Sequence, residues 1–201
     1  MTIRTITPRQ ATPTDEDYAL AGIRALLRLM GEDPDREGLR ETPARVVKAY
    51  RELSRRPGDP VALLGRVFAD TDYQADQMVA VGPIEFVSLC EHHLLPFTGK
   101  AWVAYIPEGD RVVGLSKLPR LVDHYAGRPQ VQERMTSQVA DAIERHLEPR
   151  GVAVVVRAHH SCMGLRGVRK PDALMTTSSL HGAFKENPET RAEFLALTRD
   201  A

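Results

Sequence analysis

The sequence predicts an α+β protein in which a four-stranded, mostly antiparallel sheet carries two helices on one face. Two observations lead to this fold class. The spacing of apolar residues is helical in the N-terminal part and becomes typical of strands after residue 75. From residue 78 onward the expected order is strand, strand, helix, helix, strand, strand. Helices inserted between two hairpins are expected to cover one face of such a sheet.

The N-terminal part divides into a tail and a helical arm. Residues 1–13 are polar, contain two prolines and are predicted to be a flexible tail. Residues 14–74 are predicted to be a helical region, with a first helix that begins near Thr14. A second helix is predicted to begin at Thr42, because Pro43 in the first helical position loses no donor that the helix needs.

Residues 75–201 are predicted to form the main domain. Its expected strands, including a short extended piece at 112–115, cover 77–90, 98–107, 112–115, 152–162 and 173–180. Its expected helices cover 116–127, 129–151 and 187–199, and Pro149 and Gly151 end the second of them. The sheet would have two open edges, which are a liability unless they are covered. Pairing with neighbouring subunits would cover them, so we expect a ring-forming homo-oligomer.

The composition of the chain indicates which kinds of partner the protein lacks and where in the cell it is expected. Hydrophobic residues make up 42% and charged residues 27% of the chain, and the formal net charge is zero. The chain therefore lacks the global basic character of a nucleic-acid binder. No segment has the roughly 18 apolar residues that cross a bilayer, and the N-terminus lacks the apolar core of a secretory signal. We therefore expect a cytoplasmic protein with no nucleic-acid or membrane partner.

The segment "SLCEHHLLPF" places Cys90 three residues before His93, which is a pair of possible metal ligands. Cys162, in the segment "VVVRAHHSC", is the candidate for a third ligand, because the ends of two strands of one sheet can converge. Zinc suits mixed thiolate and imidazole ligands, and three protein ligands leave a fourth position open for water. The alternative is that both cysteines are simply small buried residues. A disulfide is not expected in a reducing cytosol.

Two further histidines flank these ligands. His92 precedes His93, and His160 lies two residues before Cys162. Neither is needed to complete a set of three ligands, so both are available for proton transfer beside the metal.

Several separated segments together resemble the GTP cyclohydrolase I family. They are "ETPARV", "SLCEHHLLPFTGKAWVAYIP", "GLSKLPRLVDHYAGRPQVQER", "HHSCMGLRGV" and "TRAEFL". The resemblance covers most of residues 14–199. It implies a tunnelling fold, in which the unit predicted above assembles into a homodecamer of two stacked pentamers, with active sites between subunits. It also implies conversion of GTP and water to formate and 7,8-dihydroneopterin triphosphate, the first step of folate or tetrahydropterin biosynthesis.

The resemblance also assigns roles to individual residues. It implies zinc ligation by Cys90, His93 and Cys162, protonation of guanine N7 by His160, and a second catalytic role for His92. It implies that a carboxylate reads the guanine edge and that several cations bind the triphosphate. By resemblance, the substrate contacts are Glu133 with Gln132 at the base, Ser116, Lys117, Arg120 and Arg166, and Arg45 across a subunit boundary.

The chain departs from the family pattern at Ser161, where some members carry an aromatic residue, but no ligand or catalytic histidine is lost. Two other functions remain open at the level of the sequence. One is a related tunnelling-fold enzyme acting on another purine or pterin. The other is a non-catalytic oligomer that zinc stabilises and that binds a nucleotide or a regulatory protein. No feature of the sequence indicates a regulatory protein partner.

Overall fold

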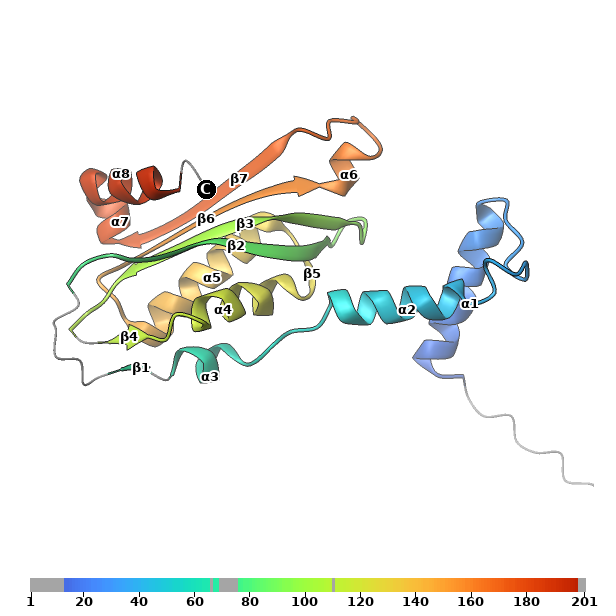
Figure 1. Cartoon of the computed structure of the whole chain (residues 1–201), viewed down its shortest axis with the longest axis horizontal. Helices are drawn as coiled ribbons and strands as arrows, with labels where there is room; N and C mark the ends of the chain where they lie inside the picture. Colours follow the sequence, from blue (N-terminus) through green and yellow to red (C-terminus); the bar gives the residue numbers. More distant parts are fainter. Residues whose placement is uncertain (1–12, 66, 69–75, 110, 199–201) are drawn as a thin grey trace, which may run out of the picture. The chain divides into compact units, whose positions relative to one another are not determined.

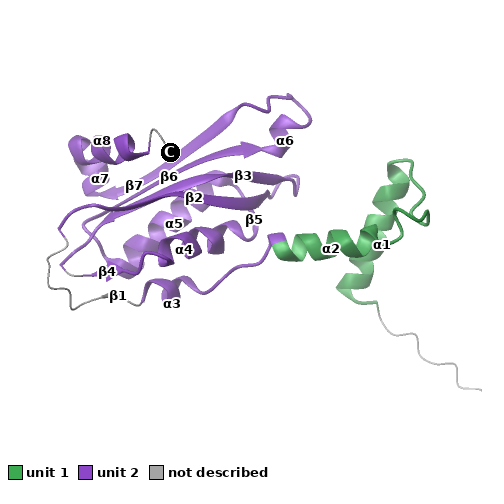
Figure 2. Cartoon of the chain, in the orientation of Figure 1, with its two compact units in different colours: residues 1–52 green, residues 53–201 purple. Residues whose placement is uncertain are grey.

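The chain forms two compact units in a computed structural model that describes residues 13–65, 67–68, 76–109 and 111–198. Unit 1 is Met1–Glu52 and unit 2 is Leu53–Ala201 (Figure 2). The predicted domain limits, after residues 13 and 74, stay predictions. Residues 1–12 of the predicted tail and residue 199 of the last predicted helix lie outside the described residues.

Unit 1 contains the two predicted helices, α1 (Asp15–Leu29) and α2 (Thr42–Leu53). Helix α1 begins with a capping box, in which the Thr14 side chain accepts from the Asp17 backbone and the Asp17 side chain accepts from the Thr14 backbone. An ion pair of 2.8 Å between Arg51 and Glu16 connects the two helices. The predicted start of each helix is confirmed, since α1 begins directly after Thr14 and α2 begins at Thr42.

Unit 2 contains a five-stranded sheet in the order β5-β2-β3-β6-β7. Its strands are β2 (Val79–Cys90), β3 (Pro96–Ile106), β5 (Pro129–Gln130), β6 (Gly151–His160) and β7 (Leu174–Gly182). Its helices are α3 (Pro60–Leu64), α4 (Lys117–Ala126), α5 (Gln132–Leu147), α6 (Ser161–Gly164), α7 (Ala183–Glu186) and α8 (Pro188–Leu197). Two short strands, β1 (Val67–Phe68) and β4 (Val112–Val113), pair separately. Among the described residues, no helix has the length and apolar character to cross a bilayer.

Helices α4 and α5 cover one face of the sheet, as Figure 1 shows. Side chains alternate between the two faces of a strand, and those of β2, β3 and β6 that face these helices form the main core. The predicted apolar stripe of α5 lies in this core, with exposed fractions of at most 1% for Met135, Val139, Ile143 and Leu147. The predicted strand and helix order is thus present in unit 2.

The opposite face of the sheet is covered only in part. Trp102 and Val155 point to this face and form a second cluster with Phe184 of α7 and Phe194 of α8. Helix α8 therefore covers one end of the face (Figure 1), and the other end carries polar side chains.

The end of β6 differs from the prediction. The strand was expected to run to Cys162, but it ends at His160, and Cys162 lies in the helical turn α6. The Leu165 backbone N–H donates to the Ser161 carbonyl at 3.0 Å, which closes this turn. The backbone at Cys162 is therefore helical, and its side chain leaves the chain in a different direction from that of a residue in a continuing strand.

A further strand, β5, was not predicted. It pairs in parallel with the end of β2, with Leu89 opposite Pro129 and Cys90 opposite Gln130. Two residues are too few to show the alternation that identifies a strand in a sequence. This pairing places the N-terminus of α5 beside the end of β2, where the possible metal ligands begin.

Candidate metal centre

The first two possible ligands come from the tight turn that follows β2. Cys90 is the last residue of the strand, and its carbonyl accepts from the backbone N–H groups of His93 at 3.3 Å and Leu94 at 2.7 Å. Leu94 has a φ of 54°, so the chain reverses there before β3 begins. The turn brings the His93 Nδ1 to 3.8 Å from the Cys90 sulfur.

Cys162 completes the group from the helical turn that follows β6. Its sulfur lies 3.9 Å from that of Cys90, although 72 positions separate the two residues in the sequence. The possible ligand atoms of Cys90, His93 and Cys162 all lie within 4.8 Å of one another. The structure therefore brings together the three residues that the sequence indicated.

The spacing of these atoms fits a zinc ion. Two sulfurs that are each about 2.3 Å from one tetrahedral zinc ion stand about 3.8 Å apart, close to the arrangement of Cys90 and Cys162. A disulfide would require about 2.05 Å, and both cysteines are free. The donor set of two sulfurs and one imidazole is one that zinc prefers.

Arg166 contacts the other nitrogen of the His93 ring. Its Nη1 lies 3.3 Å from His93 Nε2. A guanidinium only donates, so Nε2 accepts in this arrangement and the ring proton is on Nδ1. A metal at Nδ1 would require Arg166 to turn away, because the neutral ring would then carry its proton on Nε2.

His92 lies next to this group, and His160 lies two residues before Cys162 in the sequence. The His92 Nδ1 is 3.9 Å from the Cys90 sulfur, and the side chain is exposed. His160 ends β6 opposite Phe97 of β3, and the two rings stack at 4.5 Å with an angle of 3° between their planes. Phe97 is fully buried, so it gives the imidazole a rigid support.

Gln132 connects His160 to the start of α5. The His160 Nε2 lies 2.9 Å from the Gln132 Oε1, and Gln132 is fully buried. Glu133, the next residue, is exposed, because successive residues of a helix point about 100° apart. The start of α5 thus directs one side chain to the histidine and its neighbour to solvent.

An ion pair that the sequence did not indicate lies beside the turn. Arg134 of α5 pairs with Glu91, which stands between Cys90 and His92. The Arg134 Nε also donates to the Gln130 Oε1 at 2.7 Å, and the Glu91 backbone N–H donates to the Gln130 carbonyl at 3.0 Å. These contacts join the turn after β2 to the first turn of α5. No motif in the sequence indicated them, since they depend on the parallel pairing of β5.

The electrostatics of the group follow from burial and from neighbouring charges. Burial raises the pKa of the Cys162 thiol, and the nearby Cys90 sulfur raises it further. Burial lowers the pKa of His160, an effect that the Glu133 carboxylate opposes. A hydrogen bond from Arg134 lowers the pKa of Glu91. In the metal-free chain, Cys162 is therefore a thiol and His160 a neutral imidazole near pH 7.

The other predicted substrate contacts lie elsewhere in the fold. Ser116 precedes α4, Lys117 is its first residue, and Arg120 lies one turn later. In the part of the chain that the structure describes, no hydrogen bond or ion pair joins these three to the metal centre. Arg45 belongs to unit 1, where its Nη2 donates to the Thr42 Oγ1 at 3.1 Å.

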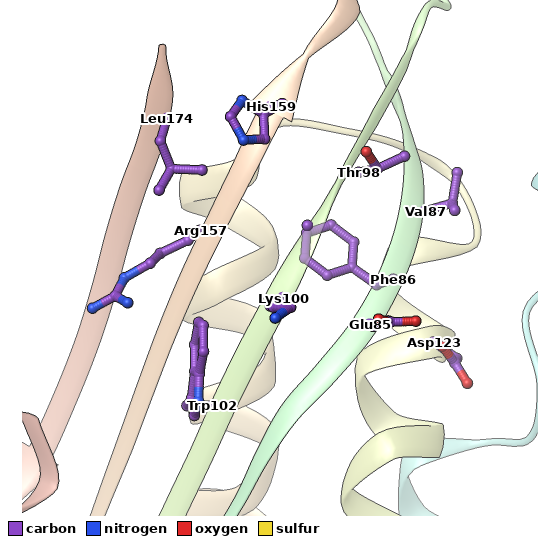
Figure 3. Close-up of a pocket in the computed structure, with 11 residues that line it drawn as sticks. Glu85, Phe86, Val87, Thr98, Lys100, Trp102, Asp123, Arg157, His159 and Leu174 are labelled. Carbon is purple, nitrogen blue, oxygen red and sulfur yellow. The ribbon is translucent and has the colours of Figure 1, made fainter. Parts of the chain in front are cut away.

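A hollow of about 700 Å³ lies outside this centre. Figure 3 shows its lining, which includes Thr98, Lys100, Trp102 and Arg157, and these side chains alternate with those that face α4 and α5. None of the predicted site residues lines it. A second group of possible metal ligands, Asp141, Glu144 and His181, joins α5 to β7, and its His181 Nδ1 lies 2.6 Å from a Glu144 oxygen.

Comparison with known proteins identifies relatives over nearly the whole chain. Residues 19–199 match the family described as GTP cyclohydrolase I. A GTP cyclohydrolase 1 of Rhodopirellula baltica is 53% identical over 196 residues, which cover 96% of this chain and 84% of that protein. A GTP cyclohydrolase 1 of Mycolicibacterium paratuberculosis is 55% identical over 190 residues, with 94% and 92% covered. One of Corynebacterium glutamicum is 51% identical over 187 residues, with 92% and 94% covered.

Proposed function

Because the chain belongs to the GTP cyclohydrolase I family, we propose that it is a zinc-dependent enzyme that converts GTP and water to formate and 7,8-dihydroneopterin triphosphate. One observation carries this proposal beyond the family name. Two thiols and an imidazole from distant segments have the spacing of a three-ligand zinc site, with His92 beside Cys90 and His160 two residues before Cys162. A structural zinc site is closed by four ligands, whereas three ligands leave a position for chemistry.

Each group has a distinct part in this proposal. Cys90, His93 and Cys162 would hold the ion, which would supply Lewis acidity to a water molecule near neutral pH. Attack at C8 of guanine becomes easier when N7 is protonated, and His160 is the group assigned to that proton. His92 is exposed beside Cys90 and serves as the second proton-transfer group.

Glu133 is the proposed reader of the guanine edge. It is exposed in the first turn of α5, directly after the residue that contacts His160. Its carboxylate can accept from the guanine N1–H and the N2 amine together, which fixes the base in one orientation. Gln132 was predicted to stand beside the base as well, and that contact stays a prediction.

The triphosphate requires cations, which the proposal takes from separate segments. They are Lys117 and Arg120 of α4, Arg166 after α6, and Arg45 of a neighbouring subunit, with Ser116 as a polar contact. The proposal therefore includes a homodecamer of two pentamers in the tunnelling fold, with active sites between subunits. The product would enter folate or tetrahydropterin biosynthesis.

Incubation of the zinc-loaded protein with GTP tests the proposal. Formate should appear together with a new ultraviolet absorbance, and oxidation of the product should give a fluorescent pterin. Cys162→Ser should lose zinc and activity while the protein remains folded. A zinc-loaded wild-type protein that binds GTP but releases no formate would instead support a non-catalytic nucleotide-binding oligomer. Formate release from a different purine, with none from GTP, would support the related enzyme.

A further inference from the structure

The buried amide of Gln132 has only one possible orientation. Its Nε2 lies 3.1 Å from the Val156 carbonyl, 3.0 Å from the Met175 carbonyl and 3.1 Å from the Thr177 Oγ1. Backbone carbonyls only accept hydrogen bonds, so the amide NH2 must face them and the amide oxygen must face the other way. Exchanging the two ends of the amide would place an oxygen against two carbonyl oxygens, at a fully buried position where water cannot compensate.

The orientation of the amide determines the tautomer of His160. The Gln132 Oε1 lies 2.9 Å from the His160 Nε2, and an amide oxygen can only accept. The Nε2 atom therefore carries a hydrogen. In the neutral ring the other nitrogen, Nδ1, then carries a lone pair.

Two threonines hold the Gln132 amide in place. The Thr136 Oγ1 donates to the Gln132 backbone carbonyl at 2.8 Å, which uses its only hydrogen. The Thr177 hydroxyl, 2.7 Å away, must then donate to Thr136, and it accepts from the Gln132 amide. The three residues form a closed ring of directional hydrogen bonds between α5 and β7, in which the two hydrogens of the Gln132 amide are shared among three acceptors.

The Nδ1 atom of His160 faces away from this network. Among the described residues it has no hydrogen-bond partner, and the only buried side-chain nitrogen or oxygen without a partner there is the Trp102 Nε1. The His160 Nδ1 is therefore reached by solvent. Stacking on Phe97 keeps the ring plane fixed, so one nitrogen is turned inward and the other outward.

We propose that Gln132 is a positioning residue that fixes the Nε2–H tautomer of His160 and makes Nδ1 the ring atom that exchanges a proton with the substrate. This inference rests on the proposed function. The proposed function assigns a proton transfer to His160, and the outward Nδ1 is the ring atom whose lone pair this arrangement leaves free for it. The Nε2–H bond to Gln132 is the same before and after the transfer, so the ring need not turn.

The tautomer can be measured without any turnover. Solid-state NMR of the zinc-loaded protein with ¹⁵N-labelled histidine distinguishes a protonated from an unprotonated ring nitrogen, and the His160 signals are those lost in His160→Ala. We expect hydrogen on Nε2 and none on Nδ1 near neutral pH. A neutral His160 with its hydrogen on Nδ1 would overturn the proposal, whatever the enzyme activity.

Kinetics test the consequence for catalysis. Gln132→Met keeps the length of the side chain but removes the acceptor, so kcat for formate release should fall about tenfold to a hundredfold. Gln77→Met makes the same change at an exposed position, where the amide contacts the neighbouring Asp76, and should leave kcat unchanged. A folded, zinc-loaded Gln132→Met enzyme with wild-type kcat would contradict the inference. A wild-type enzyme without formate release would defeat the proposed function, and the NMR result would still decide the tautomer.

Discussion

Zinc binding should weaken as the pH falls, because an ion must displace a proton from Cys162. Metals bind the thiolate, and burial and the Cys90 sulfur raise the pKa of the Cys162 thiol. The metal-free protein therefore holds this proton throughout the neutral range. Each ion bound releases it, so lower pH favours the metal-free form.

The size of the effect follows from the number of protons displaced. One proton per ion makes the apparent dissociation constant rise about tenfold for each pH unit lost, or about 1.4 kcal/mol. Between about pH 8 and pH 6.5, Cys162 alone should then weaken binding about 30-fold. Protons displaced from other ligands would add to this slope.

Competition with a chromogenic chelator, corrected for its own protonation, measures the slope. Cys162→Asp offers the ion a ligand that is already ionised at neutral pH, so its slope should be smaller than that of the wild type by about one proton per ion. Ser161→Ala, at the neighbouring position, should retain the wild-type slope. Equal slopes for the wild type and Cys162→Asp would refute the reasoning.

Three other perturbations test the surroundings of the centre. Phe97→Leu removes the ring that stacks on His160, so formate release should fall while zinc content is kept; unchanged release would argue against a supporting role. Met135→Ala, at a fully buried position of α5, should lower the free energy of unfolding by about 2–5 kcal/mol in urea titrations, whereas exposed Ser137→Ala should not. Glu91→Arg breaks the ion pair with Arg134 and should weaken zinc binding in the chelator assay. Adding Arg134→Glu should restore part of the binding. A double variant that binds zinc no better than the single one would show that the ion pair does not position the turn.

The long elements of the fold could be predicted because their sequences have a clear period. The α5 stripe from Met135 to Leu147 repeats every four residues, and β2 and β6 are rich in β-branched residues. The short elements could not be predicted in this way. Strand β5 has two residues and exists because the chain after α4 pairs with the end of β2. Helix α3 follows a segment that was expected only to end α2, and Asp59 and Pro60 form its start.

The candidate site likewise contains residues that the sequence could predict and contacts that it could not. Cys90, His93 and Cys162 could be found because few residue types bind zinc and the chain has only two cysteines. The contacts of Gln132 and Arg134 could not be found, since glutamine and arginine are common on helices and their partners lie on distant strands. Only the register of β6 and β7 against α5 determines which carbonyls meet the Gln132 amide.

The distance in sequence between the two sulfurs determines when the centre can form during synthesis. Cys162 lies 72 positions after Cys90 in the sequence, so it has not yet been translated when Cys90 and His93 leave the ribosome. A nascent chain can therefore offer an ion only two of the three ligands, which hold it weakly. Loading with metal must therefore wait until β6 has been translated and has paired with β3.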